Sequence, residues 1–211
     1  MTITITRKFV IVSLAVLGLV TLLVVSGLFI ISKRTDTTGV LSQNIIHNTY
    51  TVTDDEGLLN VDVPELFVNM TADEPKGFVY DRKTLYKGGV TDSRYAPANV
   101  TIYLEKGLRA ATNFVKQEHL AIVSDTASRA LPQTYPGYTK ESEKLLDVAG
   151  KKAIEFVFEY TGKDSDVRIK QRLLGVLIDQ DRIIYFRLQS LSTSYEEINN
   201  QYFEYLLKSY E

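Results

Sequence analysis

Cysteine and tryptophan are absent from this sequence of 211 residues, and histidine occurs only at His47 and His119. Without cysteine the chain can form no disulfide, no thiolate nucleophile and no zinc–thiolate site. The sequence also lacks the glycine-rich patterns of nucleotide-binding loops, the G-x-S-x-G pattern of serine hydrolases and the H-E-x-x-H pattern of zinc proteases. These absences predict a protein that is not an enzyme, that holds no cofactor and no metal, and that is stabilised by packing alone.

The two histidines and one acidic turn are the nearest approach to catalytic or metal-binding residues. His47 falls in a polar segment, and His119 falls near the end of an expected helix, where a cation interacts favourably with the helix dipole. The run from Asp54 through Asp55 and Glu56 to Gly57 offers carboxylates that suit a calcium ion. Its spacing does not fit an EF-hand loop, and acidic residues with glycine are ordinary turn formers, so we interpret it as a turn.

Charge is missing from one long stretch, residues 9–31, which starts at Phe9 and ends at Ile31. As a helix this stretch would be about 34 Å long, enough to cross a hydrocarbon core of about 30 Å. We therefore expect the membrane lipid bilayer to be one partner of the chain. A cleaved signal peptide is the alternative, but its apolar region normally spans about 7–15 residues and ends at a small-residue cleavage site.

The layout around the apolar stretch predicts its orientation. Arg7 and Lys8 precede it and Lys33 and Arg34 follow it, so the flanking charges are equal. A short basic tail usually stays in the cytoplasm, whereas long carboxy-terminal domains cross the membrane largely regardless of charge. We expect a cytoplasmic tail at residues 1–8, a transmembrane anchor at 9–31, a tether at 32–48 and an extracytoplasmic domain at 49–211.

The expected domain carries an excess of acidic residues. The first 34 residues contain four of the 24 basic residues and none of the 26 acidic ones, so the remainder has a net charge of about −6. Such a surface is a poor match for nucleic acid. The predicted localisation is the cell membrane, with the domain outside the cytoplasm.

Hydrophobic periodicity in the first half of the domain predicts a hairpin, two short strands and a helix. The hairpin is expected over residues 49–52 and 58–63, the strands over 78–80 and 100–104, and the helix over 108–120. Residues 65–97 otherwise read as irregular, because glycine and proline divide them into short pieces. A stretch rich in Ser, Thr, Pro and Gly, residues 124–139, is expected to be a loop.

The second half shows stronger strand patterns. Strands are expected over residues 144–148, 153–160, 168–178 and 182–191, with a turn between each strand and the next. Ser194 and Glu197 have the spacing of a capping box, which predicts that a closing helix starts there. The order of elements predicts an α+β fold with a central, mostly antiparallel sheet flanked by helices and preceded by one transmembrane helix.

The second half also resembles a known family. The run DVAGKKAIEFVFEY at residues 147–160, the strand pair after it and the ending YEEINNQYFEYLLKSYE are similar to the PsbP-like domain. The family's glycine turn corresponds to Gly150, its small residue to Ala153 and its final triplet to residues 208–210. The resemblance implies an antiparallel sheet flanked by helices and a non-enzymatic binding or assembly role.

Tyrosine is abundant, with 13 residues, and it is the most suitable residue type for a binding surface. The candidates in the segments expected to be irregular are Tyr80, Tyr86, Tyr95, Tyr135 and Tyr138. We expect a non-catalytic binding or accessory module that engages an envelope protein. Two alternatives stay open at this point: an envelope hydrolase whose carboxylates converge only in the fold, and a carrier of a small apolar ligand.

Overall fold

The computed structural model describes residues 48–74, 76–79, 81–92, 96–108, 118–163 and 165–210. Its first half contains a two-stranded hairpin and the first three strands of the main sheet. These elements are β1 (Thr49–Thr53), β2 (Asn60–Pro64), β3 (Val68–Asn69), the 3-10 turn η1 (Thr71–Asp73), β4 (Arg82–Gly89) and β5 (Ala98–Glu105). Strands β1 and β2 pair with each other in antiparallel fashion.

The second half supplies one long helix, four long strands and a closing helical segment. These are α3 (His119–Thr134), β6 (Thr139–Val148), β7 (Lys151–Thr161), β8 (Arg168–Leu177), β9 (Ile183–Leu191), α4 (Tyr195–Ile198), the π-helical turn η2 (Asn199–Phe203) and α5 (Glu204–Ser209). The seven-stranded sheet has the order β3-β4-β5-β9-β8-β7-β6, and all its pairings are antiparallel. The expected α+β fold with an antiparallel sheet is confirmed.

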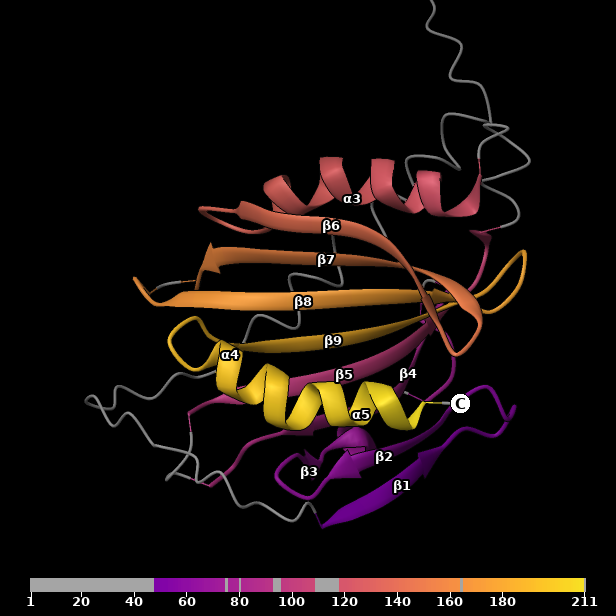
Figure 1. Ribbon diagram of the computed structural model, residues 1–211, viewed down its shortest axis with the longest axis horizontal. Helices are drawn as coiled ribbons and strands as arrows, with labels where there is room; N and C mark the ends of the chain where they lie inside the picture. The colour runs from indigo at the N-terminus through magenta and orange to yellow at the C-terminus, as the bar shows by residue number, and fades with distance from the viewer. Residues whose placement is uncertain are drawn as a thin grey trace, which may run out of the picture.

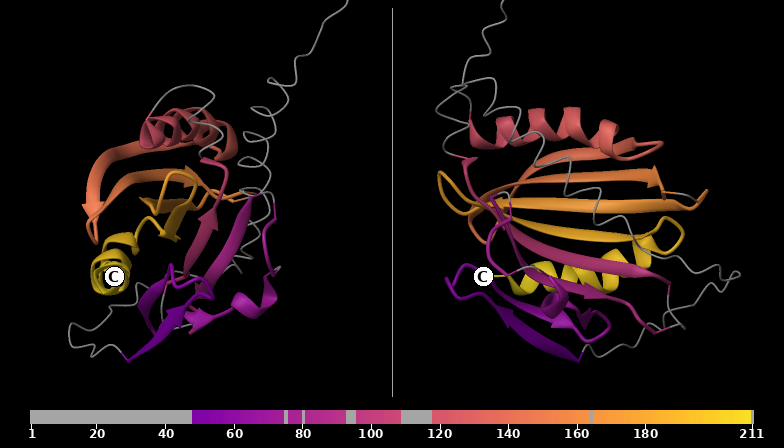
Figure 2. Two further views of the ribbon diagram at one scale, coloured as in Figure 1. Left: turned by 90° about the vertical axis from the view of Figure 1, so that its right-hand side faces the viewer. Right: turned by 180° about the vertical axis from the view of Figure 1, so that it is seen from behind.

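Helices cover both faces of this sheet. The segment α4–η2–α5 lies across one face, beside the β1–β2 hairpin, and α3 lies on the other face near β6 and β7 (Figure 1, Figure 2). We call these the α5 face and the α3 face. The sheet curls at β6 and β7, so these strands bend over the closing helix (Figure 2).

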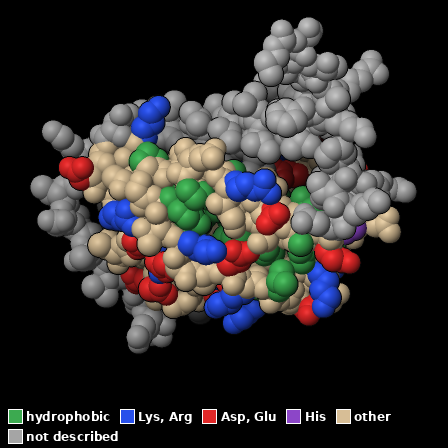
Figure 3. Space-filling model, turned by 90° about the horizontal axis from the view of Figure 1, so that it is seen from above, with side chains coloured by type: hydrophobic (Ala, Val, Ile, Leu, Met, Phe, Trp, Pro, Cys, Tyr) green, Lys and Arg blue, Asp and Glu red, His purple; other side chains and the backbone are tan. Residues whose placement is uncertain are grey.

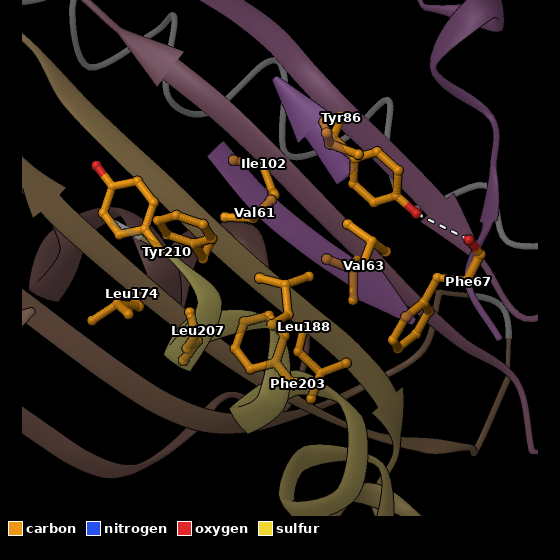
Figure 4. Close-up of a cluster of buried hydrophobic side chains, with 14 of the residues drawn as sticks. Val61, Val63, Phe67, Tyr86, Ile102, Leu174, Leu188, Phe203, Leu207 and Tyr210 are labelled. Carbon is orange, nitrogen blue, oxygen red and sulfur yellow. Dashed lines mark hydrogen bonds between the residues drawn. The ribbon is translucent and has the colours of Figure 1, made fainter. Parts of the chain in front are cut away.

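The α5 face holds the larger hydrophobic core. Side chains from β2, β5, β8, β9 and the closing helix interdigitate there, among them Val63, Leu188 and Phe203, each fully buried (Figure 4). The Tyr86 hydroxyl donates to the carbonyl oxygen of Phe67 at 3.1 Å. This bond satisfies a polar group that would otherwise be costly to bury.

Two local expectations about secondary structure are wrong. Residues 124–134, part of the stretch expected to be a loop, belong to α3: Val123, Ala127, Ala130 and Leu131 form a buried stripe at helical spacing, and Pro132 comes only in the last turn. Residues 82–89 form β4, whose alternation is interrupted by an irregular register between Thr84 and Tyr86. Interrupted alternation hides a strand from periodicity, because one extra residue reverses the faces of all residues after it.

The closing helix forms where it was expected, but without the capping box. The Ser194 side chain makes no capping hydrogen bond and donates instead to the carbonyl oxygen of Leu191 at 3.3 Å. His119 is the first residue of α3 and so lies at the amino-terminal end of a helix, where the dipole does not favour a cation. Its Nε2 atom lies 3.0 Å from the carbonyl oxygen of Gln180.

Among the residues that the structure describes, no helix has both the length and the apolar character needed to span a bilayer. Residues 9–31, the expected anchor, and residues 32–47 of the expected tether lie outside the described residues. Membrane anchoring therefore stays a prediction from the sequence.

Candidate functional site

Two of the tyrosines expected on a binding surface are core residues. Tyr86 is 0% exposed in β4, where its hydroxyl lies 2.7 Å from the Tyr50 hydroxyl. Tyr135 follows α3 and is 6% exposed, with its ring 4.4 Å from the ring of Tyr160. These two rings cannot form an exposed surface, because the domain uses their large apolar area in its own core.

The remaining tyrosine candidates leave little surface among the described residues. Tyr138 is half-buried, with its ring 5.2 Å from the ring of Phe158. Tyr80 and Tyr95 lie outside the described residues. A binding role for Tyr80, Tyr95 or the exposed part of Tyr138 stays a prediction.

A group of polar side chains is buried on the α3 face of β5, β8 and β9, and we call it the polar cluster. Its members are Thr101, Gln171, Arg187 and Gln189, which are 7%, 0%, 6% and 8% exposed. Arg187 Nη2 donates to Thr101 Oγ1 at 3.0 Å. Gln189 Nε2 donates to Gln171 Oε1 at 2.6 Å and to the Tyr160 hydroxyl at 2.9 Å. The cluster thus contains two sets of hydrogen bonds inside the domain, one between Arg187 and Thr101 and one that joins Gln189 to Gln171 and Tyr160.

The tyrosines that surround the polar cluster are held in the neutral form. Burial raises the pKa of Tyr103 to about 12, although the positive charges of Arg82 and Arg187 oppose this shift. Burial also raises the pKa values of Tyr135 and Tyr160, again against the charge of Arg187. At neutral pH these hydroxyls are hydrogen-bond donors and not general bases, since a base must give up its proton near the working pH.

An ion pair lies close to the polar cluster, between the first residue of β4 and the last residue of β5. The Arg82 guanidinium binds the Glu105 carboxylate, with side chains 9% and 19% exposed. Arg82 also lies over the ring of Tyr103, with Cζ 4.2 Å from the ring centroid. The ring of Tyr103 stacks on that of Tyr185 at 5.0 Å. Charge and ring stacking together fix the orientation of these four side chains.

A second polar group, which we call the charged seam, lies on the α5 face between β6–β8 and the closing helix. Arg172 Nε donates to Glu155 Oε2 at 2.6 Å, and its Nη1 donates to Glu204 Oε1 at 2.5 Å and to Asn199 Oδ1 at 2.9 Å. Asn199 opens the π-helical turn η2. Such turns are rare and alter the direction of side chains along a helix, and here the turn brings Asn199 to the arginine.

Lys170 extends the charged seam to β6 and α4. Its Nζ lies 2.7 Å from Glu141 Oε2 and 3.1 Å from Glu196 Oε1. Burial disfavours the charged form of Lys170, but the hydrogen bonds that its ammonium group donates to Glu141 and Glu196 outweigh this effect and raise its pKa. Each basic side chain of the seam is therefore neutralised by carboxylates, and the seam fastens the closing helix to the outer strands.

The acidic turn that could have bound calcium is organised by backbone contacts. The Asp54 carboxylate accepts from the N–H groups of Glu56, Leu58 and Leu59 at 3.1, 2.6 and 2.7 Å. Glu56 forms an ion pair with Arg182 at 3.2 Å. Over the described part of the chain, no three His, Asp or Glu side chains group as a metal site would require.

The outer edge of β6 is the most accessible long backbone edge in the described sheet. Strand β6 is ten residues long and pairs with β7 on one side only, whereas β3 at the opposite edge has two residues. Leu145 in β6 is 72% exposed, more than the other exposed large hydrophobic residues Val68, Phe78 and Tyr205. Seen from the side of α3, acidic and basic side chains surround small hydrophobic groups (Figure 3). This edge is our candidate binding surface.

Sequence reasoning missed this edge and the two polar groups. The alternation in residues 183–189 did indicate a mixed face with Tyr185, Arg187 and Gln189, but not its partners on β5 and β8. The charge pattern of residues 140–144, Lys-Glu-Ser-Glu-Lys, is a signal that could have indicated an exposed edge strand, because charged residues protect such edges.

Comparisons with known proteins bear on the fold alone. No family model matches the sequence, and no curated protein matches it. One similar solved structure is the cyanobacterial PsbP (CyanoP) from Synechocystis sp. PCC 6803, with a TM-score of 0.47, 10% identity, and coverage of 82% of this chain and 98% of that chain. A PsbP protein is thus among the structures that this chain is similar to.

Two further structures are similar to the same extent. LpqN, involved in cell envelope biogenesis of Mycobacterium tuberculosis, has a TM-score of 0.44 and 12% identity, covering 74% of this chain and 86% of its own. The Ran-binding protein Mog1p of Saccharomyces cerevisiae has a TM-score of 0.44 and 10% identity, and the match covers 78% of this chain and 95% of Mog1p. All three TM-scores are below 0.5, so no activity or partner is inferred from them.

Proposed function

We propose that this chain is a single-pass membrane protein that presents a non-catalytic binding or accessory module outside the cytoplasm and engages an envelope protein there. The observation that carries the proposal is the uncharged stretch of residues 9–31, which precedes a separately folded, net-acidic domain. In this arrangement the anchor fixes the domain near the membrane surface, and the domain supplies the contact with the partner.

The state of the buried ionisable groups supports a non-catalytic role. Glu155 is 6% exposed and bound to Arg172, and Glu105 is bound to Arg82. Each of these carboxylates is thus engaged by a guanidinium inside the domain and takes part in a structural ion pair. We therefore do not propose the envelope hydrolase that the sequence alone leaves open.

The placement of the domain is tested by protease treatment of intact cells that express the full chain with a carboxy-terminal epitope. We expect the domain to be digested from outside, while a cytoplasmic control protein survives. Survival of the domain in intact cells, followed by digestion after lysis, would contradict the proposed orientation.

The binding role is tested with the full chain in its membrane. A photo-reactive amino acid replaces single exposed residues on β6 and, as a matched control, Tyr205 on α5. We expect a cross-link to one defined envelope protein from β6 positions, reproduced when that protein is tagged and purified. Absence of a protein cross-link from any exposed position would contradict the role of binding module.

A further inference from the structure

We propose that the outer edge of β6 is a docking site for an extended segment of a partner protein, which adds to the sheet as a further strand with two central apolar residues and a basic residue at each end. This inference rests on the proposed function of a binding module and specifies where the partner binds and by which chemistry. Strand addition at a sheet edge is a recurrent mode of peptide recognition, with affinity from backbone bonds and specificity from alternate side chains.

The turn between β6 and β7 fixes which backbone groups of β6 face outward. Ala149 and Gly150 have φ values of 48° and 73°, and two positive φ values in a two-residue loop define a type I′ hairpin. In such a hairpin the flanking residues, Val148 and Lys151, form a hydrogen-bonded pair. Hydrogen-bonded and non-hydrogen-bonded pairs then alternate along the antiparallel ladder.

The alternation assigns the outward-facing groups of β6 to every second residue before the turn. Residues whose N–H and C=O point to β7 are Ser142, Lys144, Leu146 and Val148. Those whose N–H and C=O point away from the sheet are Glu143, Leu145 and Asp147. A partner strand about 4.8 Å away can bond to all three outward-facing residues. The side chains of Asp147 and Leu145 are 61% and 72% exposed, so the approach is open there, with Asp147 in a surface ion pair with Lys152 at 3.1 Å. Glu143 is 24% exposed, and its carboxylate accepts hydrogen bonds from Ser124 of α3 and from Lys140.

A second copy of this chain is a poor occupant of the edge. In antiparallel self-pairing, each outward-facing residue must oppose an outward-facing residue of the other copy. A pairing centred on Glu143 sets it against itself, and one centred on Leu145 sets Glu143 against Asp147. A pairing centred on Lys144 or on Asp147 sets that residue against itself. A pairing centred on Leu146 avoids like charges, but it sets Leu145 against Asp147 and Glu143 against the turn residue Ala149, which leaves a short and mismatched ladder. Like charges directly opposite each other are destabilising, which is how natural edges avoid self-association.

The same residues specify a different partner. Glu143 and Asp147 each have one surface lysine beside them, Lys140 and Lys152, and a basic residue on the partner strand would add a second cation to each. Leu145 and Leu146 favour apolar residues opposite them, and Lys144 favours an acidic residue. Read along an antiparallel partner, the pattern is basic, apolar, apolar, acidic, basic. The net charge of about −6 over residues 35–211 further favours a basic segment and increases the rate of encounter.

The direct test uses the full chain in detergent micelles and a fluorescent peptide, Thr-Lys-Val-Val-Glu-Lys-Thr, followed by fluorescence anisotropy. We expect this peptide to bind roughly tenfold more tightly than a peptide of the same composition in the order Lys-Lys-Thr-Glu-Thr-Val-Val. Hydrogen exchange should slow at the amides of Glu143, Leu145 and Asp147 when the peptide is bound. Equal affinity of the two peptides would overturn the proposal.

Substitutions at Leu145 separate the contribution of its backbone N–H to peptide binding from that of its side chain. Leu145→Pro removes an outward N–H and no bond to β7, because proline is tolerated where the strand N–H faces solvent. We expect Leu145→Pro to abolish peptide binding, and Leu145→Ala, which keeps the N–H, to weaken it only severalfold. Circular dichroism checks that both variants are folded. Unchanged binding by a folded Leu145→Pro variant would overturn the proposal.

A charge exchange provides a test that does not depend on proline. Asp147→Lys should weaken binding of the first peptide by several fold and should be rescued by a peptide with glutamate at its first charged position, Thr-Glu-Val-Val-Glu-Lys-Thr. The matched control is Lys163→Glu, an exposed residue on a turn beyond β7, which should leave both affinities unchanged. Failure of the altered peptide to recover binding would count against the assigned register.

The cellular experiment separates this inference from the proposed function. If the chain with Leu145→Pro still cross-links to the same envelope protein as the original chain, the binding role holds and the β6 site is wrong. If the cross-link is lost in Leu145→Pro and kept in Leu145→Ala, the β6 site is supported. If no envelope protein cross-links to the original chain, the proposed function fails, while the peptide assay still decides whether the β6 edge accepts a strand.

Discussion

The two halves of the sheet bury opposite faces. In β5 and β9 the apolar residues, such as Ile102 and Phe186, point to the α5 face, and the polar residues Thr101 and Arg187 point to the α3 face. In β7 the pattern is reversed: Phe156 belongs to the core under α3, whereas Glu155 on the opposite face binds Arg172. Strand β8 lies between them and carries polar groups on both faces.

This crossover explains why the domain has two cores and two buried polar groups. The α5 core is centred on β5 and β9 but also includes Leu174 and Val176 of β8, and the α3 core is centred on β7 but also includes Tyr103 of β5 and Tyr185 of β9. Opposite each core the sheet presents polar side chains, the polar cluster on one face and the charged seam on the other. Internal hydrogen bonds and ion pairs hold each polar group together and offset the cost of burying it, although Gln171 Nε2 is buried without a hydrogen-bond partner.

The largest effect is expected from truncating one phenylalanine in each core. Phe203→Ala on the α5 face and Phe158→Ala on the α3 face should each lower the free energy of unfolding by about 3–5 kcal/mol, since both rings are 0% exposed. Urea unfolding followed by circular dichroism measures this. A cost below about 1 kcal/mol at either site would show that only one core stabilises the domain.

Breaking the charged seam should cost somewhat less. Arg172→Leu leaves Glu155 buried without its cation and should destabilise the domain by about 3 kcal/mol. The double variant Arg172→Leu with Glu155→Leu should recover most of this loss, because two apolar residues can replace a buried ion pair. The same urea titration checks both. A double variant as unstable as the single one would mean that the seam is held by more than this pair.

Removing one member of the polar cluster should have a smaller effect. Gln171→Leu deprives the Gln189 amide and the Tyr135 hydroxyl of an acceptor, which predicts a loss of about 1–3 kcal/mol. Thr139→Leu at an exposed position of β6 is the control and should stay within about 0.5 kcal/mol of the original chain. A neutral Gln171→Leu variant would show that the network contributes no net stability.

The smallest effect at neutral pH is expected for Tyr103→Phe, whose consequence lies at alkaline pH. Burial raises the pKa of Tyr103 in the folded state to about 12 from its ordinary value of 10.0. The unfolded chain therefore loses this proton first, so the stability from Tyr103 is fully present below about pH 10 and is lost as the pH rises through about 12. The free energy of unfolding, measured from pH 9 to 12, should fall less steeply with pH in Tyr103→Phe than in the original chain.

A matched variant on the opposite face sharpens the alkaline comparison. Burial also raises the pKa of Tyr210 to about 12, and the charge of Asp54 adds to the shift. Tyr210→Phe should therefore reduce the alkaline slope by an amount similar to Tyr103→Phe. If only one of the two variants has a reduced alkaline slope, the pKa of a buried tyrosine is raised on that face of the sheet and not on the other.

The strands of the second half could be predicted because their alternation is regular. Residues 153–160, 168–178 and 182–191 correspond closely to β7 (Lys151–Thr161), β8 (Arg168–Leu177) and β9 (Ile183–Leu191). Strand β4 was missed because its irregular register and its two final glycines disturb the pattern. Helix α3 was missed because its exposed Ser, Thr and Pro residues outweigh a narrow stripe of small apolar side chains.

The candidate site was less predictable than the fold. Composition favoured the tyrosines, but whether a tyrosine is exposed depends on what packs over it, and Tyr86 and Tyr135 are covered by residues distant in the sequence. The β6 edge depends on the position of a strand in the sheet order. No local pattern encodes that position, because β9, the last strand in the chain, lies in the middle of the sheet.

The sequence by itself determined the uncharged stretch, the antiparallel strand pairs and which residues of each strand share a face, because these follow from length and a period of two. Tertiary structure alone decided which face each apolar set occupies. The alternations of β7 and β9 look alike in the sequence, yet the register through β8 sets Phe156 on the same face as Arg187. Register is a long-range property, and it alone turns two similar strands toward opposite cores.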